Sequence, residues 1–347
     1  MPAPPKTSTA ASPAAAPAAA PERPNALLTS AGRRVSLLRI VQRELRALNG
    51  PEAKVFTTDL DPAMSTACRL SDGGLTVGRF RDEGYMPYLL ELCLVRGIGV
   101  VIPTLDPELP LYAAWRARFA EAGVDIVVSD GDFVAACNDK AQTSAFFARY
   151  GIGTAEEYSA DAPAFPMFVR PRRGSSGKDL HVVTSAAGFA ERLKDGSQFV
   201  YSAYLDPARH TEFTVDLYFD REHRLRCCVP RERIAVRGGE VSKGVTRRNF
   251  LVDYLNSRLA CVAGARGCVT LQVFVEEGTE NVYGIEINPR FGGGYPLSDA
   301  ARAAYVRWVL EEWRGRIVTW RTDWTPNLYM LRYDEELFFE LSSTSDV

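Results

Sequence analysis

Short apolar runs alternate with helical patterns between Asn25 and about residue 130, and this alternation constrains the fold more than any other feature of the chain. A strand is expected over Ala26–Ser30, and a helix follows because apolar residues recur at three- and four-residue spacing from Val35 to Leu48. Strands that alternate with helices favour a parallel, doubly wound α/β sheet. The same pattern predicts further strands over 54–58, 99–103 and 125–129, and helices over 83–95 and 112–122.

The pattern changes after about Phe133, where most predicted strands follow one another without a helix between them. Adjacent strands of this kind favour an antiparallel sheet. We therefore expect a parallel α/β domain followed by an α+β half. Strands are predicted over 166–170, 180–183, 199–204, 211–220, 224–229, 269–276 and 282–288, and helices over 139–150 and 187–193.

Composition argues against several classes of protein. The 41 Lys and Arg residues nearly balance the 43 Asp and Glu residues, which is not typical of a general nucleic-acid binder. The longest apolar runs, such as Leu89–Val95, are much shorter than a membrane span requires. Residues 1–24 are rich in Ala and Pro, so we expect a disordered tail, with a targeting or docking arm as the alternative. The seven cysteines contain no CxxC pair, which indicates neither a disulfide framework nor a zinc site and favours the reducing cytoplasm.

Two groups of residues have the chemistry of a nucleotide site. The first begins at Arg170, where a predicted strand leads into a loop of Gly, Ser and basic residues that ends at Lys178. Glycines let backbone N–H groups approach phosphate oxygens, and hydroxyl and cationic side chains supply further donors. An ordinary basic hairpin is the alternative. The loop is not a Walker A motif, because Asp179 follows the lysine.

The second group lies in the last predicted strand, where Glu286 and Asn288 are two residues apart and therefore face the same side. Gln272 can lie opposite them on the neighbouring strand. One carboxylate with two amide oxygens suits Mg²⁺ shared with nucleotide phosphates. Arg290 would project toward the same region, where it could hold a transferred phosphoryl group. A polar strand end is the alternative for these residues taken alone.

The order of these groups along the chain resembles the ATP-grasp superfamily, in particular the branch similar to the large subunit of carbamoyl-phosphate synthase. The resemblance extends from about Asn25 to Phe339. Its motifs are Asn25-Ala-Leu-Leu-Thr-Ser-Ala-Gly-Arg-Arg-Val, Asn138-Asp-Lys140, Val169-Arg170-Pro with Gly174-Ser-Ser-Gly177, Glu212-Phe-Thr-Val-Asp216, Gln272 and Glu286-Ile-Asn-Pro-Arg290-Phe-Gly-Gly-Gly. It implies an ATP-grasp fold of mixed α/β and α+β class, with a Rossmann-like pre-ATP-grasp domain over 25–130, a small lid subdomain over 131–199, and a large subdomain with a C-terminal extension over 200–347.

The resemblance also implies roles for individual residues, with ATP and Mg²⁺ as cofactors and Mn²⁺ as a replacement for the magnesium. Lys140 and Arg170 would contact the ATP phosphates as catalytic residues. The loop of Gly174, Ser175, Ser176 and Gly177 would close over the phosphates. The nucleoside would be bound by Glu212, and adenine would be contacted by Ala203, Tyr204 and Leu205. The metal would be held by Gln272, Glu286 and Asn288, and Arg290 would support the phosphorylated intermediate.

Three positions depart from the pattern of many relatives. Ala203 stands where many of them have an acidic residue near the adenine amino group, which leaves the preferred nucleobase open. Arg170 replaces a lysine, although the carbamoyl-phosphate-synthase-like branch also has arginine there and the phosphate-binding role is kept. The stretch Asp206–Thr211 is longer than the usual turn.

The resemblance implies a carboxylate–amine ligase that forms an amide or peptide-like bond through an acyl phosphate and releases ADP and phosphate. Its partners would be small-molecule or peptide carboxylates and amines, not nucleic acid or membrane, and a homodimer is compatible with the sequence. Two alternatives stay open: an ATP-binding regulatory protein without turnover, and a subunit of an assembly that contains a glutaminase. The regulatory alternative is less favoured because the chain keeps the full set of Gln272, Glu286, Asn288 and Arg290.

Substrate residues are expected at two places. Arg33, Asp106 and Glu108 lie at predicted strand ends, where doubly wound sheets bind ligands. Arg33 and Arg34 together could form an anion site at the start of the following helix, and a solvated helix start is the alternative. The stretch from residue 231 to Arg247 is rich in cations, which suits an anionic substrate, and a mobile solvated loop is its alternative. The candidates within this stretch are Arg231, Arg233 and Lys243.

Overall fold

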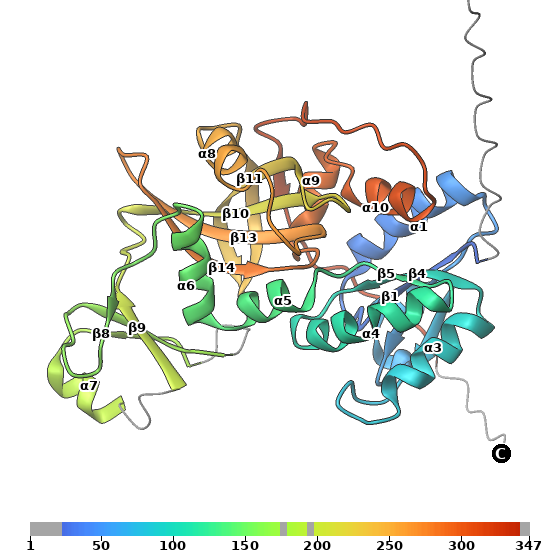
Figure 1. The fold of residues 1–347 in the computed structure, drawn as a ribbon, viewed down its shortest axis with the longest axis horizontal. Coiled ribbons are helices and arrows are strands. Elements are labelled where there is room, and N and C mark those ends of the chain that lie inside the picture. The colour runs from blue at the N-terminus through green and yellow to red at the C-terminus, as the bar shows by residue number, and fades with distance from the viewer. Residues whose placement is uncertain (1–22, 174–178, 193–197, 341–347) are drawn as a thin grey trace, which may run out of the picture.

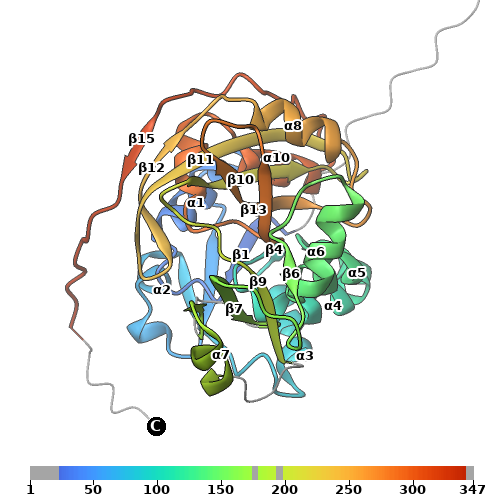
Figure 2. The ribbon, with the colours of Figure 1, turned by 90° about the vertical axis from the view of Figure 1, so that its left-hand side faces the viewer.

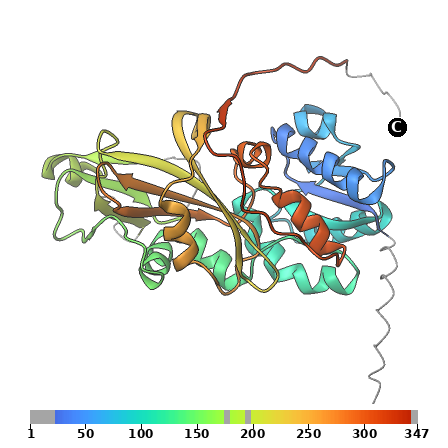
Figure 3. The same ribbon diagram turned by 90° about the horizontal axis from the view of Figure 1, so that it is seen from above.

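The computed structural model describes residues 23–173, 179–192 and 198–340 (Figure 1). Three sheets follow one another along the long axis, with a four-stranded sheet at one end, a six-stranded sheet in the middle and a five-stranded sheet at the other end (Figure 1, Figure 3). None of the helices in these ranges has the length and apolarity to cross a lipid bilayer. The expected tail lies almost wholly outside the described residues.

The N-terminal unit is a parallel sheet in the order β3-β2-β1-β4-β5, so the predicted doubly wound α/β domain is confirmed. Ala26 and Leu28 of β1 face the core under α1, whereas Leu27 faces the core under α3 and α4. The elements are β1 Asn25–Thr29, α1 Val35–Asn49, β2 Val55–Asp59, η1 Pro62–Met64, α2 Thr66–Leu70, β3 Gly73–Thr76, α3 Tyr85–Val95, β4 Ile98–Pro103, η2 Asp106–Glu108, α4 Leu109–Glu121 and β5 Asp125–Ile126.

The middle sheet is antiparallel, as predicted, with the order β14-β13-β10-β11-β12-β15. The stretch from residue 231 to 247 is not a mobile loop: it belongs largely to two paired strands that turn at Gly238 and Gly239, whose φ angles are 59° and 79°. The elements are β10 His210–Phe219, β11 Leu225–Arg237, β12 Glu240–Thr246, α8 Leu251–Arg258, β13 Gly267–Glu276, β14 Val282–Asn288, α9 Tyr295–Ala300, α10 Tyr305–Trp313 and β15 Tyr329–Leu331.

The small sheet has the order β6-β9-β7-β8 (Figure 2). It has a core of its own, in which Phe189 packs edge-on against Tyr201. Helices α5 and α6 connect it to the N-terminal unit. The elements are α5 Gly131–Asn138, α6 Lys140–Arg149, β6 Glu157–Tyr158, β7 Met167–Pro171, β8 His181–Val183, α7 Ala186–Arg192 and β9 Phe199–Ala203. The phosphate loop expected at Gly174, Ser175, Ser176 and Gly177 lies outside the described residues.

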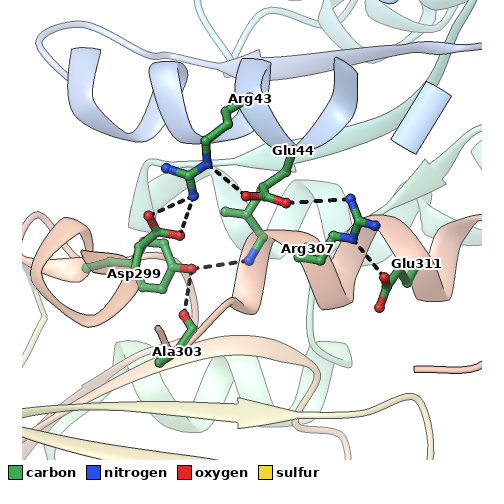
Figure 4. A network of polar contacts seen from close by, with 8 residues as sticks. Arg43, Glu44, Asp299, Ala303, Arg307 and Glu311 are labelled. Carbon is green, nitrogen blue, oxygen red and sulfur yellow. Dashed lines mark hydrogen bonds and ion pairs between the residues drawn. The ribbon is translucent and has the colours of Figure 1, made fainter. Parts of the chain in front are cut away.

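The N-terminal unit and the middle sheet share one hydrophobic core, which contains Leu38 of α1, Tyr218 of β10 and Trp308 of α10. Polar contacts also join α1 to α9 and α10 beside this core (Figure 4). Arg43 of α1 donates to both carboxylate oxygens of Asp299 at 3.0 and 2.8 Å. The two units are therefore held in one relative position. The strand ends of the N-terminal sheet and of the middle sheet that face each other consequently have fixed positions.

Candidate active site

The floor of the site is the pair of strands β13 and β14. Gln272 and Glu286 are directly opposite each other in the antiparallel register. The Asn288 side-chain amide donates to Glu286 Oε1 at 2.9 Å, so these two side chains lie on one side of the strand. The expectation that the three residues face one another is confirmed, because alternation along β14 and the register of the hairpin both place them there.

Lys140 enters the site from the first residue of α6. Its neighbour Asp139 caps this helix by accepting the Ala141 N–H at 3.1 Å. Asp139 also accepts from Arg172 Nε, at 2.9 and 3.0 Å to its two oxygens, and the Lys140 N–H donates to the Arg172 carbonyl at 3.1 Å. These contacts tie the start of α6 to the end of β7, so the backbone of Lys140 has a fixed place between the small sheet and β14.

Arg170 reaches the site from β7 and spans two sheets. Its Nη1 donates to the carbonyl of Ile285 on β14 at 3.2 Å. Its Nε is buried and has no hydrogen-bond partner among the described residues. Burial lowers the pKa of Arg170, and Glu286 opposes this change. Burial also lowers the pKa of Lys140, with a further decrease from the charge of Arg170. Lys140 and Arg170 are therefore two desolvated cations that share Glu286 as a neighbour, and each also has one further carboxylate nearby, Asp139 and Glu157 respectively.

Glu212 on β10 is a second carboxylate near Glu286. Burial raises the pKa of Glu212, Arg233 lowers it through its charge and hydrogen bond, and Glu286 raises it again. The bond from Arg233 Nη1 to Glu212 Oε1 measures 2.6 Å. Arg233 thus supports the expected nucleoside residue and is not free to meet a substrate in this structure.

Glu286, Gln272 and Asn288 offer one carboxylate and two amide groups, and carboxylate and amide oxygens are ligand types that suit Mg²⁺. In this structure Asn288 presents its amide nitrogen to Glu286. No group of three or more His, Cys, Asp and Glu side chains suited to a metal occurs in the described part of the chain. A metal at this place would therefore depend on amide oxygens beside a single carboxylate, and the charges of Lys140 and Arg170 would supply the rest of the neutralisation of bound phosphates.

Arg290 joins this centre to the N-terminal unit. It donates to Asp106 Oδ2 through Nε at 3.0 Å and through Nη2 at 2.5 Å. Arg34, which precedes α1, donates to the carbonyls of Phe291 and Thr104 at 3.1 and 3.3 Å. Burial lowers the pKa of Arg34 to about 10, and the charge of Arg290 contributes to the decrease.

The structure places Arg34 at this junction and leaves Arg33 exposed at the start of α1. The sequence indicated an anion site at this pair of arginines but placed only Arg33 among the expected substrate residues. Asp106 is brought to the site by its pairing with Arg290. Two residues further along the same turn, Glu108 accepts from the Ser30 hydroxyl at 2.5 Å.

Two of the other expected substrate residues lie elsewhere. Arg231 is buried, with 2% of its side chain exposed, and forms a bidentate ion pair with the fully buried Asp216 at 2.8 and 2.9 Å. This pairing gives Arg231 a structural role and does not support the expected contact with substrate. Lys243 is exposed on β12, opposite Leu331 of β15.

The strand expected to border adenine ends at Ala203. The Ala203 N–H donates to the Glu156 carbonyl at 2.8 Å and the Tyr204 N–H to the Pro166 carbonyl at 3.3 Å. Both groups are therefore engaged within the protein, and Leu205 follows them directly at the edge of the small sheet. The longer stretch predicted after it is a turn, 206–209, that leads into β10.

Comparison with known proteins gives two family matches. Residues 26–127 match the model of the PylC-like N-terminal domain. Residues 199–335 match the model described as ATP-grasp in the biosynthetic pathway with Ter operon. The second match confirms the predicted ATP-grasp domain in the C-terminal part of the chain. A search of curated protein sequences finds no match to the chain.

Solved structures share the fold at low sequence identity. The biotin carboxylase domain dimer of Hydrogenobacter thermophilus 2-oxoglutarate carboxylase, in complex with MgADP, ADP and bicarbonate, has a TM-score of 0.69 at 15% identity, over 88% of this chain and 73% of that one. N5-carboxyaminoimidazole synthetase from Staphylococcus aureus, complexed with ADP, has a TM-score of 0.65 at 14% identity, over 88% and 79%. The biotin carboxylase–β-γ-ATP complex from Campylobacter jejuni also has a TM-score of 0.65, at 13% identity, over 88% and 74%. The predicted ATP-grasp fold is thereby confirmed.

Proposed function

We propose that this protein, which combines a PylC-like N-terminal domain with an ATP-grasp domain, is an ATP-dependent carboxylate–amine ligase that releases ADP and phosphate. The observation that carries the proposal is the convergence of Lys140, Arg170 and Glu286 from three separate elements. We assign the lid to residues 131–199 and the large subdomain to 200–347, with the pre-ATP-grasp domain over 25–130. The similar structures contain ADP and MgADP, which supports a nucleotide ligand for this chain, and we place it between lid and large subdomain.

In this proposal the chain binds and orients the reacting groups and contributes no nucleophile of its own. Lys140 and Arg170 hold the ATP phosphates, and Glu212 holds the nucleoside. The N–H groups of Ala203 and Tyr204 are engaged within the protein, so we expect the contact with the base to come from Leu205. Phosphoryl transfer to a carboxylate needs positioning and charge neutralisation, and an amine then displaces phosphate from the acyl phosphate.

Mg²⁺ at Gln272, Glu286 and Asn288 would supply charge neutralisation to the phosphates. Arg290 would stabilise the transferred phosphoryl group, and Asp106 would hold its guanidinium in place. A carboxylate partner is favoured by the cationic character of this junction, where Arg34, Arg290 and Arg332 outnumber the carboxylates of Asp106 and Glu240.

The test is a turnover screen with ATP, Mg²⁺ and paired pools of carboxylates and amines. Phosphorus NMR of the mixture should show ADP and phosphate, and mass analysis should show a product joined by an amide bond. AMP and pyrophosphate as main products would contradict the acyl-phosphate route. Tight ATP binding without cleavage in any pool would favour a regulatory protein, and cleavage that requires a co-purified glutaminase would favour a subunit of a larger assembly.

A further inference from the structure

A cavity of about 520 Å³ lies at the carboxyl edge of the five-stranded sheet, next to the junction of Asp106 with Arg290. It lies between the ends of β1, β2 and β4 and the segment that connects β3 to α3. Its lining includes Ser30, Asp59, Val77, Arg79, Tyr85 and Glu108. This pocket is separate from the nucleotide residues, none of which belongs to its lining.

The inner end of the pocket carries a buried acid that is only half satisfied. Glu108 is 3% exposed, and its Oε1 accepts from the Ser30 hydroxyl at 2.5 Å. Its Oε2 is buried without a hydrogen-bond partner among the described residues. Burial raises the pKa of Glu108 to about 7, Ser30 opposes this, and the charge of Asp59 raises it further. A buried carboxylate that faces a second one is costly unless a cation comes between them.

The walls and the mouth of the pocket have a different chemistry. Leu60 and Leu105 line it although they are 54% and 41% exposed, and Val77 adds a buried apolar surface. Arg79 and Arg81 also line it and are both exposed. The pocket thus has an acidic end, an apolar wall and a basic mouth. These features match a molecule that has a cationic group, an apolar group and an anionic group in the corresponding places.

We propose that this pocket binds an amino acid with an apolar side chain, with its ammonium group at Glu108 and Asp59 and its carboxylate at Arg79 and Arg81. The apolar side chain would cover Leu60, Val77 and Leu105. This inference rests on the proposed ligase function in one respect only: it identifies the bound amino acid as one of the two substrates.

The position of the pocket agrees with that role. Asp106 and Glu108 belong to the same 3₁₀ turn, η2. Asp106 holds Arg290, the residue assigned to the phosphoryl group, while Glu108 lines the pocket. A ligand at Glu108 would therefore lie one turn from the proposed reacting centre.

The test is calorimetry on the full chain without nucleotide, with L-leucine, L-methionine and L-phenylalanine as probes. At least one should bind. For L-leucine, the counterparts 3-methylbutylamine and 4-methylpentanoate lack the carboxylate and the ammonium group, and both should bind more weakly. Glu108→Gln should weaken binding of the amino acid roughly tenfold or more, because it removes the charge that pairs with the ammonium group. Glu91→Gln on the exposed face of α3 is the matched control and should leave affinity unchanged.

Arg79→Ala and Arg81→Ala provide a second, surface-exposed pair of variants that do not endanger folding. Each should weaken binding of the amino acid while leaving binding of the amine unchanged. The proposal is overturned if none of the three amino acids binds, if 4-methylpentanoate binds as well as L-leucine, or if Glu108→Gln retains full affinity in a folded protein. ATP cleavage, measured on the same protein with the paired pools of carboxylates and amines, separates the two questions: amino-acid binding without cleavage in any pool would retain the pocket and reject the ligase, and the converse would reject only the pocket.

Discussion

Glu286 lies where cations from two other elements meet a strand end, and it is the only carboxylate of the proposed metal site. Glu286→Ala should abolish ATP cleavage, because the phosphates would lose the metal that neutralises them. Circular dichroism should be unchanged, since the residue is not part of a hydrophobic core. Glu280→Ala, in the exposed turn of the same hairpin, is the matched control. A folded Glu286→Ala protein with near-normal turnover would place the metal elsewhere.

Arg290 should affect the chemical step more than nucleotide affinity. Its guanidinium is held by Asp106 at the junction with the N-terminal unit, whereas Lys140 and Arg170 are the cations proposed to contact the ATP phosphates. Arg290→Ala should therefore keep its ATP affinity and lose turnover by roughly two to four orders of magnitude. Arg290→Lys should recover little, because a point charge cannot replace the bidentate fork. Calorimetric ATP titration together with steady-state rates tells whether Arg290 acts in the chemical step or in nucleotide binding. Weak ATP binding with normal kcat would contradict a role in the chemical step.

Glu312 on α10 gives a prediction about pH. Burial raises the pKa of Glu312 to about 7, while the Tyr218 hydroxyl, which donates to it at 3.1 Å, opposes the change. The folded protein therefore prefers the neutral carboxyl, and its stability should fall as the pH rises from about 4.5 through 7. Glu312→Gln removes this loss, so its free energy of unfolding should exceed that of the wild type by up to about 3 kcal/mol at pH 8. Denaturant unfolding at pH 5 and pH 8 measures the difference, and Glu121→Gln should show none.

At the scale of the element, the glycine run after β14 has a packing reason. A Cβ on Gly294 would lie 2.0 Å from Arg231 Nη1 and 2.8 Å from Val241 Cγ1. Both neighbours are buried, and Arg231 is fixed by its ion pair with Asp216. Gly294→Ala should therefore destabilise the protein by about 1–3 kcal/mol through overpacking. Thermal unfolding measures this, and Gly315→Ala would not serve as a control because its φ is positive.

Gly131→Ala is a suitable control for Gly294→Ala, since a Cβ on Gly131 would meet no atom within 4 Å and its φ is not positive. It should change stability little. Equal destabilisation by the two variants would contradict the packing explanation. The motif that begins at Glu286 thus contains a glycine, Gly294, at a position where the buried ion pair of Arg231 and Asp216 leaves no room for a larger side chain.

The elements that could be predicted from the sequence are those whose burial produces a pattern. The strands β1 and β4 are buried on both faces and appear as continuous apolar runs. The hairpin of β11 and β12 was missed beyond Val229 because its residues are mainly charged or glycine. Its regular structure comes from pairing with neighbouring strands, and no local pattern records that pairing.

At the scale of the whole molecule, some contacts of the site could be predicted from the local sequence pattern and others could not. The facing of Gln272 and Glu286 follows from strand alternation and could be predicted. The bonds from Arg290 to Asp106 and from Arg34 to Phe291 join residues 184 and 257 positions apart, and only the packing of two units creates them. The pairing of Arg231 with Asp216 was equally hidden, because nothing in a cation-rich stretch tells which cation is buried.

The shared core predicts that the N-terminal unit and the middle sheet unfold together. Leu38 of α1 is fully buried in the cluster that includes Tyr218 of β10 and Cys268 of β13. Leu38→Ala should cost about 2–5 kcal/mol of unfolding free energy. Hydrogen exchange should show the loss equally in the amides of β1 and of β13. The small sheet has a separate core, so Phe189→Ala should lower the protection of β7 and β9 and leave β13 unchanged. If Leu38→Ala weakened β1 while β13 kept its protection, the two units would be independent, and the junction of Asp106 with Arg290 would have to be positioned by its own contacts instead of by the core beneath it.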